Sequence, residues 1–230
     1  MRGAAWVFGK LFGVSGPVGV STSACVFLGM VEAPLLIKPF LPKLSRSEMF
    51  IIMVDGLSVI GGSMMIVLGA LIWAKMPNAF SHLLIVFVGL IGLINMGLAV
   101  VPHAGEPITL GFLLGKLLTP IVWLTGTPLG DLQTVGSLLG TKVAANEVVA
   151  YSDMMALPEG ALQPKSLLIL TYALGSFGNV GSVAILIGSL SAMTQEKVGE
   201  VVELGFKALA AAFLTTCLTA TILGLLSALP

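Results

Sequence analysis

Apolar residues fill most of this chain in short blocks separated by Gly, Pro and polar residues. Residues 3–14 and 18–31 form two such blocks on either side of a Gly-Val-Ser-Gly-Pro turn. Neither block reaches the roughly 20 residues that a helix needs to cross a bilayer. Residues 107–125 and 129–150 repeat the arrangement around a Thr-Gly-Thr-Pro turn. Both pairs predict re-entrant helical hairpins, because interrupted apolar segments of this kind line transporter binding sites.

Two longer apolar segments follow each pair. Residues 48–74 are interrupted by Gly and Ser between Asp55 and Ser63, and residues 167–190 are interrupted between Gly175 and Ser182. We interpret both as broken spanning helices, since Gly permits backbone that is not helical. The pattern predicts uninterrupted spans over 80–102 and 204–228, with a charged loop over 191–203.

The segments 3–74 and 107–190 share one order: hairpin, glutamate, polar connector, broken helix. We interpret this as an internal repeat, inverted as in secondary transporters. The alternative is chance, because Gly and Ser are common in membrane helices. The pattern therefore predicts an all-α integral membrane fold with two re-entrant hairpins and broken transmembrane helices. The expected parts of this single transport domain are 1–74, 75–106, 107–190 and 191–230.

Composition supports a membrane protein. The chain is 57% hydrophobic and 10% charged, against roughly 25% charged residues in a soluble domain. Zero net charge with dispersed Lys and Arg argues against a nucleic-acid partner. The sequence contains no HExxH zinc motif and no nucleophile elbow, so we expect no enzyme and no cofactor. Cys25 and Cys217 lack metal or disulfide spacing and predict buried, unreactive thiols.

The two polar connectors differ in charge. Connector 38–46 carries three positive charges and should be cytoplasmic by the positive-inside rule, whereas connector 152–166 lacks this excess. The two connectors are therefore expected on opposite sides of the membrane. Two spans between the hairpins would instead place both hairpins on one side. Either one apolar block crosses where a hairpin arm is predicted, or the chain is a shortened relative that does not form the site alone.

Two glutamates lie in apolar surroundings. Glu32 lies between Gly29 and Pro34, and Glu147 follows Asn146. A charge at membrane depth is costly and marks a ligand, a partner or a cavity. A carboxylate accepts hydrogen bonds from hydroxyl or N–H groups, so both glutamates are candidate ligand-binding residues. For Glu147 with Asn146, a polar contact between helices is the alternative.

Three blocks carry a family resemblance: GMVEAPLLIKPFLPKLSRSE from Gly29, GTKVAANEVVAYSD from Gly140 and YALGSFGNVGSVAILIG from Tyr172. They resemble the concentrative nucleoside transporter family, and the resemblance covers nearly the whole chain. It implies a multi-pass secondary active transporter of the bacterial inner membrane, coupled to sodium or protons. It also implies nucleoside and lipid bilayer as partners, and a homotrimer.

The resemblance also implies roles for individual residues. Glu32 would bind the base, next to Gly29, Met30 and Val31, and Glu147 would bind the ribose. The remaining substrate-binding positions would be Phe177, Asn179 and Ser182 in the broken helix.

The chain departs from the family in three respects. Met30 and Val31 replace polar residues that select the base, so base selectivity is left open. Cys25 and Val59 stand at sodium-ligand positions without offering a side-chain oxygen, which sodium prefers. This favours protons as coupling ion, carried by Glu32 or Glu147. The chain also lacks helices that the family has before the first hairpin and in the middle, so a non-transporting relative or a subunit of a split transporter is the alternative function.

Overall fold

The computed structural model describes residue 6 and residues 9–59, 92–102 and 108–226. Every regular element in this described part is a helix, as expected from the sequence. The chain divides into two compact units. The first unit comprises 1–73 and 176–213, and the second comprises 74–175 and 214–230.

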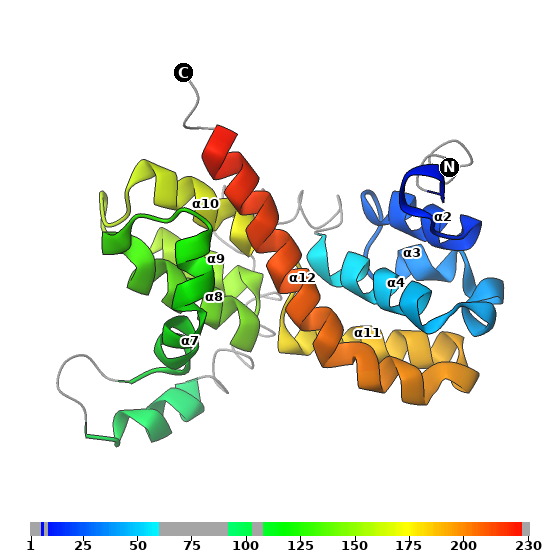
Figure 1. Cartoon of the computed structure of the whole chain (residues 1–230). Helices are drawn as coiled ribbons and strands as arrows, with labels where there is room; N and C mark the ends of the chain where they lie inside the picture. The colour runs from blue at the N-terminus through cyan, green and yellow to red at the C-terminus, as the bar shows by residue number, and fades with distance from the viewer. Residues whose placement is uncertain (1–5, 7–8, 60–91, 103–107, 227–230) are drawn as a thin grey trace, which may run out of the picture. The chain divides into compact units, whose positions relative to one another are not determined.

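The first unit is built from helices that lie far apart in the sequence (Figure 1). Its elements are α2 (Gly16–Cys25), α3 (Glu32–Leu35), η1 (Lys38–Lys43), α4 (Arg46–Ser58), α11 (Val180–Met193), η3 (Gln195–Lys197) and the first part of α12 (Val198–Leu226). They share one apolar core. Met53 of α4, Leu186 of α11 and Ala208 of α12 are each fully buried in it.

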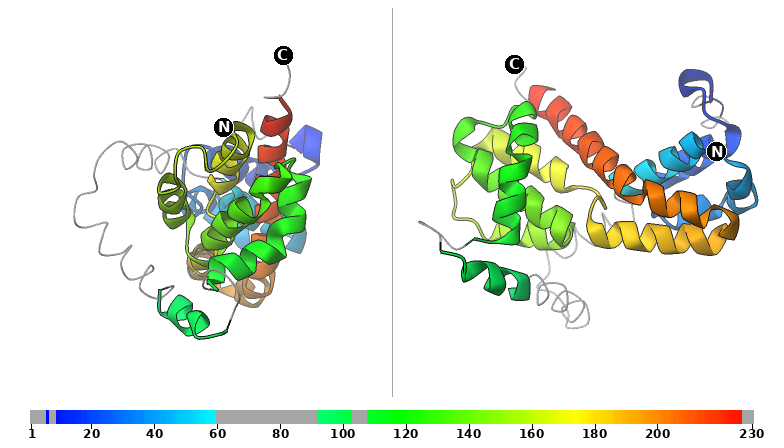
Figure 2. Two further views of the ribbon diagram at one scale, coloured as in Figure 1. Left: turned by 90° about the vertical axis from the view of Figure 1, so that its left-hand side faces the viewer. Right: turned by 60° about the horizontal axis from the view of Figure 1, so that its bottom comes forward.

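The second unit centres on two helices that lie side by side (Figures 1 and 2). Its elements are α7 (Leu110–Leu124), η2 (Leu129–Asp131), α8 (Leu132–Ala144), α9 (Glu147–Met155), α10 (Pro164–Leu174) and the end of α12. Glycines let α7 and α8 approach closely: a Cβ atom on Gly115 would lie 2.6 Å from the Ser137 amide nitrogen. One on Gly140 would lie 2.6 Å from the Gly111 oxygen.

The described part contains the expected break in the helix over 167–190. Helix α10 ends at Leu174 and α11 begins at Val180, with residues 175–179 between them. Helix α4 ends at Ser58, within the predicted interruption of 48–74. Residues 60–91 lie outside the described residues, as do the rest of that segment and most of the span predicted over 80–102.

Two local predictions were wrong. Residues 191–203 are not a loop throughout, because α11 runs to Met193 and α12 begins at Val198. The charges of this stretch are compatible with a helix, since Lys197 pairs with Glu200 at its start. The apolar block over 129–150 is also not one helix, because α8 ends at Ala144 and α9 begins at Glu147.

One helical stretch in the described part is long and apolar enough to cross a membrane. It runs from Gln195 to Leu226 and reaches a mean hydropathy of 2.0. Its apolar side chains are exposed at intervals of about one turn, as at Val202, Phe206 and Leu218. Helices α7, α10 and α11 are apolar but shorter.

Candidate functional site

The first unit places the predicted base-binding residues in the non-helical stretch between α2 and α3. Gly29, Met30 and Val31 precede Glu32, the first residue of α3. Glu32 is exposed, and its Oε2 atom lies where it would touch a Cβ atom on Gly29. The carboxylate therefore folds back over the Gly29 backbone, and a side chain at position 29 would displace it.

The stretch between α2 and α3 packs against α4. A Cβ atom on Gly56 would lie 3.0 Å from Cβ of Met30 and 3.5 Å from its Cα. The missing side chain at Gly56 thus lets α4 approach the predicted base-binding stretch. Cys25, at the end of α2, is buried, and Val59, just after α4, is partly buried.

Asn179 caps the helix that follows the break between α10 and α11. Its Oδ1 atom accepts a hydrogen bond from the backbone nitrogen of Ser182 at 2.8 Å. Asn179 is 3% exposed and Ser182 is 6% exposed, whereas Phe177 is partly buried. Capping uses the carbonyl oxygen of the Asn179 amide, so the residue has a structural role as well as the predicted binding role.

The break between α10 and α11 also adjoins α4. A Cβ atom on Gly178 would lie 3.4 Å from the Ser176 Oγ atom and 3.7 Å from the Leu57 carbonyl oxygen. The last turns of α4 therefore pack against both non-helical stretches of the first unit.

The second unit also has an asparagine cap, at the break between α8 and α9. The Oδ1 atom of Asn146 accepts a hydrogen bond from the backbone nitrogen of Val149 at 3.0 Å. Glu147 is then the first residue of α9 and is 3% exposed. A carboxylate at a helix N-terminus is favoured by the helix dipole.

A buried lysine accompanies Glu147. Lys142 is 0% exposed, and its Nζ atom donates a hydrogen bond to the carbonyl oxygen of Ala173 at 2.7 Å. Lys142 lies close enough to Glu147 for their charges to interact. The hydroxyl of Tyr151 donates to the Thr171 carbonyl oxygen at 2.6 Å, which also ties α9 to α10.

All predicted site residues except Glu147 belong to the first unit. Within that unit, α4 adjoins the stretch that holds Met30 and the one that holds Gly178. Sequence reasoning missed the burial of Lys142. A signal for Lys142 existed, since a lone lysine stands in the apolar run five residues before Glu147.

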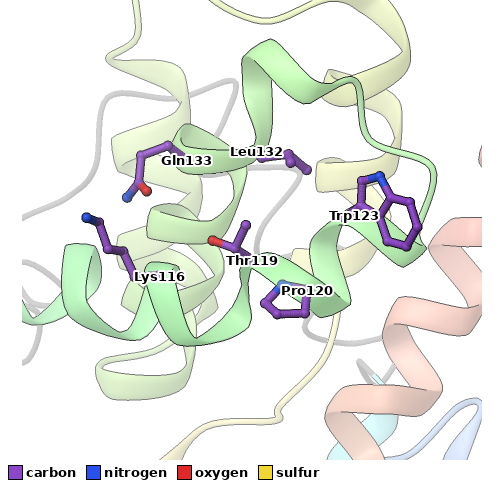
Figure 3. A pocket seen from close by; sticks show the side chains of 6 residues that line it. All are labelled: Lys116, Thr119, Pro120, Trp123, Leu132 and Gln133. Carbon is purple, nitrogen blue, oxygen red and sulfur yellow. The ribbon is translucent and has the colours of Figure 1, made fainter.

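The second unit also has an open hollow of about 580 Å³ on α7 and the start of α8. Figure 3 shows the side chains that line it: Lys116, Thr119, Pro120, Trp123, Leu132 and Gln133. None of the predicted site residues is among them.

The chain is similar to known proteins over most of its length. Residues 63–224 match the model of a family described as Na+ dependent nucleoside transporter C-terminus. The nucleoside permease NupC of Helicobacter pylori is 30% identical, over 94% of this chain and 66% of its own length. The putative nucleoside permease NupX of Escherichia coli is 28% identical, over 95% of this chain and 67% of its own length. The chain thus spans about two thirds of the length of these relatives.

Solved structures agree with this similarity. CNTnw in an inward-facing substrate-bound state superposes with a TM-score of 0.87 at 28% identity, over 98% of this chain and 68% of that one. A variant of CNTnw in an outward-facing state gives a TM-score of 0.87 at 27% identity, over 100% of this chain and 70% of that one.

Proposed function

Because this chain belongs to the Na+-dependent nucleoside transporter family, we propose that it moves nucleosides across the bacterial inner membrane by secondary active transport. The family match from residue 63 to 224 carries the proposal, because it includes α7 to α11 with both Glu147 and Asn179. The family is one of membrane transporters and not of enzymes, as the sequence led us to expect.

The proposed substrate site uses side chains suited to a nucleoside. Glu147 accepts hydrogen bonds from ribose hydroxyls, and Glu32 accepts from an N–H group of the base. The amide NH2 of Asn179 is a donor for the ligand while its oxygen caps α11. Phe177 packs its ring against the sugar or base, and Ser182 adds a hydroxyl. Gly29, Met30 and Val31 shape the base end, with apolar contacts at the last two.

We propose that α7 and α8 form a re-entrant hairpin in a multi-pass fold with an inverted internal repeat. The close approach of the two helices at Gly115 and Gly140 supports a hairpin. Breaks capped by Asn146 and Asn179 support helices interrupted at membrane depth, because such backbone needs protein groups to satisfy it. A homotrimer in the bilayer is the assembly that the family resemblance implies.

Sodium or protons drive the proposed transport. Cys25 and Val59 bring no side-chain oxygen to a sodium ion, which supports protons.

One experiment tests the transport proposal: uptake of labelled nucleosides into proteoliposomes that contain the purified chain, with a sodium gradient, a proton gradient or neither. We expect saturable nucleoside uptake, and accumulation that follows the proton gradient. Failure of every nucleoside to exchange across the vesicles would contradict transport by this chain. It would favour the alternative of a non-transporting relative or a subunit of a split transporter.

A further inference from the structure

Side chains from two other helices satisfy the C-terminal end of α10. The last four carbonyls of an α-helix have no partner within the helix, and in α10 these belong to residues 171–174. The Tyr151 hydroxyl donates a hydrogen bond to the Thr171 carbonyl oxygen at 2.6 Å. The Nζ atom of Lys142 donates to the Ala173 carbonyl oxygen at 2.7 Å. Two carbonyls of this helix end are therefore bound by donors from α8 and α9.

One of these donors also adjoins the break that follows α10. Gly175 is the first residue after the helix, and its backbone nitrogen donates to the Tyr172 carbonyl oxygen at 3.1 Å. A Cβ atom on Gly175 would lie 3.6 Å from the Tyr151 hydroxyl oxygen. The tyrosine hydroxyl thus lies at the start of the break, from which the chain continues to Phe177 and Asn179.

The two donors lie on either side of Glu147 along the chain. Lys142 is in the last turn of α8, and Tyr151 is in α9, which begins at Glu147. Glu147 and Tyr151 are four residues apart in this helix and therefore share one of its faces. Together, the two hydrogen bonds fasten both sides of the break that carries Glu147 to a single helix end.

This anchoring has the strength that a preformed site requires. Lys142 is 0% exposed, and its ammonium group meets a helix C-terminus, where the helix dipole favours positive charge. A hydrogen bond from a charged donor is also stronger than one between neutral groups. Binding side chains act well only when neighbouring groups hold them close to their working geometry. The two hydrogen bonds are suited to hold Glu147 in this way before a ligand arrives.

We propose that Lys142 and Tyr151 are positioning residues of the nucleoside site, which hold the Glu147 carboxylate where it meets the ribose. This inference rests on the proposed transport function. Both residues act through Glu147 and not on the nucleoside itself. A displaced carboxylate loses the ribose hydroxyls, whereas contacts to the base stay. The expected signature is a loss of ribose preference, defined as the ratio by which a nucleoside binds more tightly than its 2′,3′-dideoxy analogue.

The test compares Tyr151→Phe with the native protein by calorimetric titration in detergent. The ligands are adenosine, uridine and their 2′,3′-dideoxy analogues. Tyr151→Phe removes only the hydroxyl that binds Thr171. We expect ribose preference to fall about fivefold or more, because hydrogen bonds weaken steeply when they are misaligned. Affinity for the dideoxy analogues should stay native. The matched control is Tyr172→Phe, which changes an exposed tyrosine of α10 and should keep native ribose preference.

A second comparison separates positioning from a purely structural role. In the Glu147→Gln background, Tyr151→Phe should cause no further loss of ribose preference, because no carboxylate remains to be positioned. A structural role would instead lower the affinity for all four ligands alike, and that result overturns the inference. If Tyr151→Phe does not fold, Lys142→Arg decides. Arginine keeps the positive charge, but its longer side chain shifts the donor, so it should lower ribose preference, and an unchanged ratio overturns the inference.

The outcomes also separate this inference from the proposed function. A native protein that binds none of the four ligands contradicts the nucleoside function, and the inference fails with it. A native protein that binds adenosine or uridine with clear ribose preference, which Tyr151→Phe retains in full, overturns the positioning role alone. Equal affinity of the native protein for a nucleoside and its dideoxy analogue overturns the ribose role of Glu147 and therefore its positioning.

Discussion

The Nζ atom of Lys142 donates a hydrogen bond to the carbonyl oxygen of Ala173 at 2.7 Å, and no part of the lysine is exposed. This contact joins the last turn of α8 to the last turn of α10. A buried ammonium group is stable only with partners, and here they are a carbonyl at a helix C-terminus and the charge of Glu147. Lys142 therefore holds together the C-terminal ends of two helices, each of which is followed by a break.

Lys142→Met should destabilise the second unit strongly. The substitution keeps the apolar stem but leaves Glu147 without its buried counter-charge, which costs about 3–5 kcal/mol. Thermal unfolding in detergent measures the loss. Lys116→Met changes an exposed lysine of α7 and should unfold like the native protein. Equal stability of the two variants would contradict the structural role of Lys142.

Glu147→Gln should weaken nucleoside binding and leave membrane insertion intact, although it also lowers stability because the buried Lys142 loses its counter-charge. A carboxylate that accepts hydrogen bonds from the ligand contributes roughly 1.5–3 kcal/mol, which corresponds to a loss of about ten- to a hundredfold in affinity. Calorimetric titration measures the affinity directly. Glu159→Gln is the control, because Glu159 is exposed in the connector after α9. Native affinity in Glu147→Gln would rule out the ribose role.

Two substitutions separate the capping and binding roles of Asn179. Asn179→Ala removes both and should lower stability by about 1 kcal/mol in addition to weakening nucleoside binding. Asn179→Asp keeps an oxygen acceptor for the Ser182 amide but loses the NH2 donor. We expect near-native unfolding and weak binding for Asn179→Asp. If Asn179→Ala binds weakly but Asn179→Asp binds like the native protein, Asn179 acts only as a helix cap.

Gly115→Ala should loosen the pair of helices α7 and α8. The new Cβ atom would meet the Ser137 backbone at 2.6 Å, and backbone atoms move only at a cost of about 1–3 kcal/mol. Gly188→Ala in α11 is the matched control, because a Cβ atom there meets nothing within 4 Å. Detergent unfolding of the two variants should differ by this amount, and identical transitions would argue against a tight helix pair.

Cys25→Asn combined with Val59→Thr should increase sodium dependence. Both changes add side-chain oxygens at the positions where the family resemblance implies sodium ligands, and sodium prefers oxygen. Nucleoside uptake into proteoliposomes with and without sodium measures the gain. Sodium-driven uptake of the same strength in the native protein would show that backbone carbonyls already suffice, and the proton interpretation would fail.

Local sequence signals predicted the interruptions better than the helix ends. The run Gly-Ser-Phe-Gly-Asn from Gly175 to Asn179 contains two glycines and a good capping residue, and the break occurs there. The gap between Ala144 and Glu147 was missed because Ala145 is apolar and only Asn146 marks the new helix start. The start of α12 at Val198 was missed because charge was taken as a sign of a loop.

Tertiary contacts explain why other features could not be predicted. Met30 and Gly56 lie far apart in the sequence, and only the packing of α4 against the stretch after α2 brings them together. The burial of Lys142 likewise depends on α10, whose Ala173 supplies the acceptor. The fold of the Glu32 side chain back over Gly29 could also not be predicted, because it depends on the non-helical backbone between α2 and α3.

The discontinuous make-up of the first unit sets an order for its biosynthesis. Its core combines Val18, Met53 and Ala212, and Arg46 pairs with Glu203, 157 residues later in the chain. A ribosome therefore releases α2 and α4 long before their partners in α11 and α12 exist. These early helices therefore cannot complete their shared core until α11 and α12 have been synthesised.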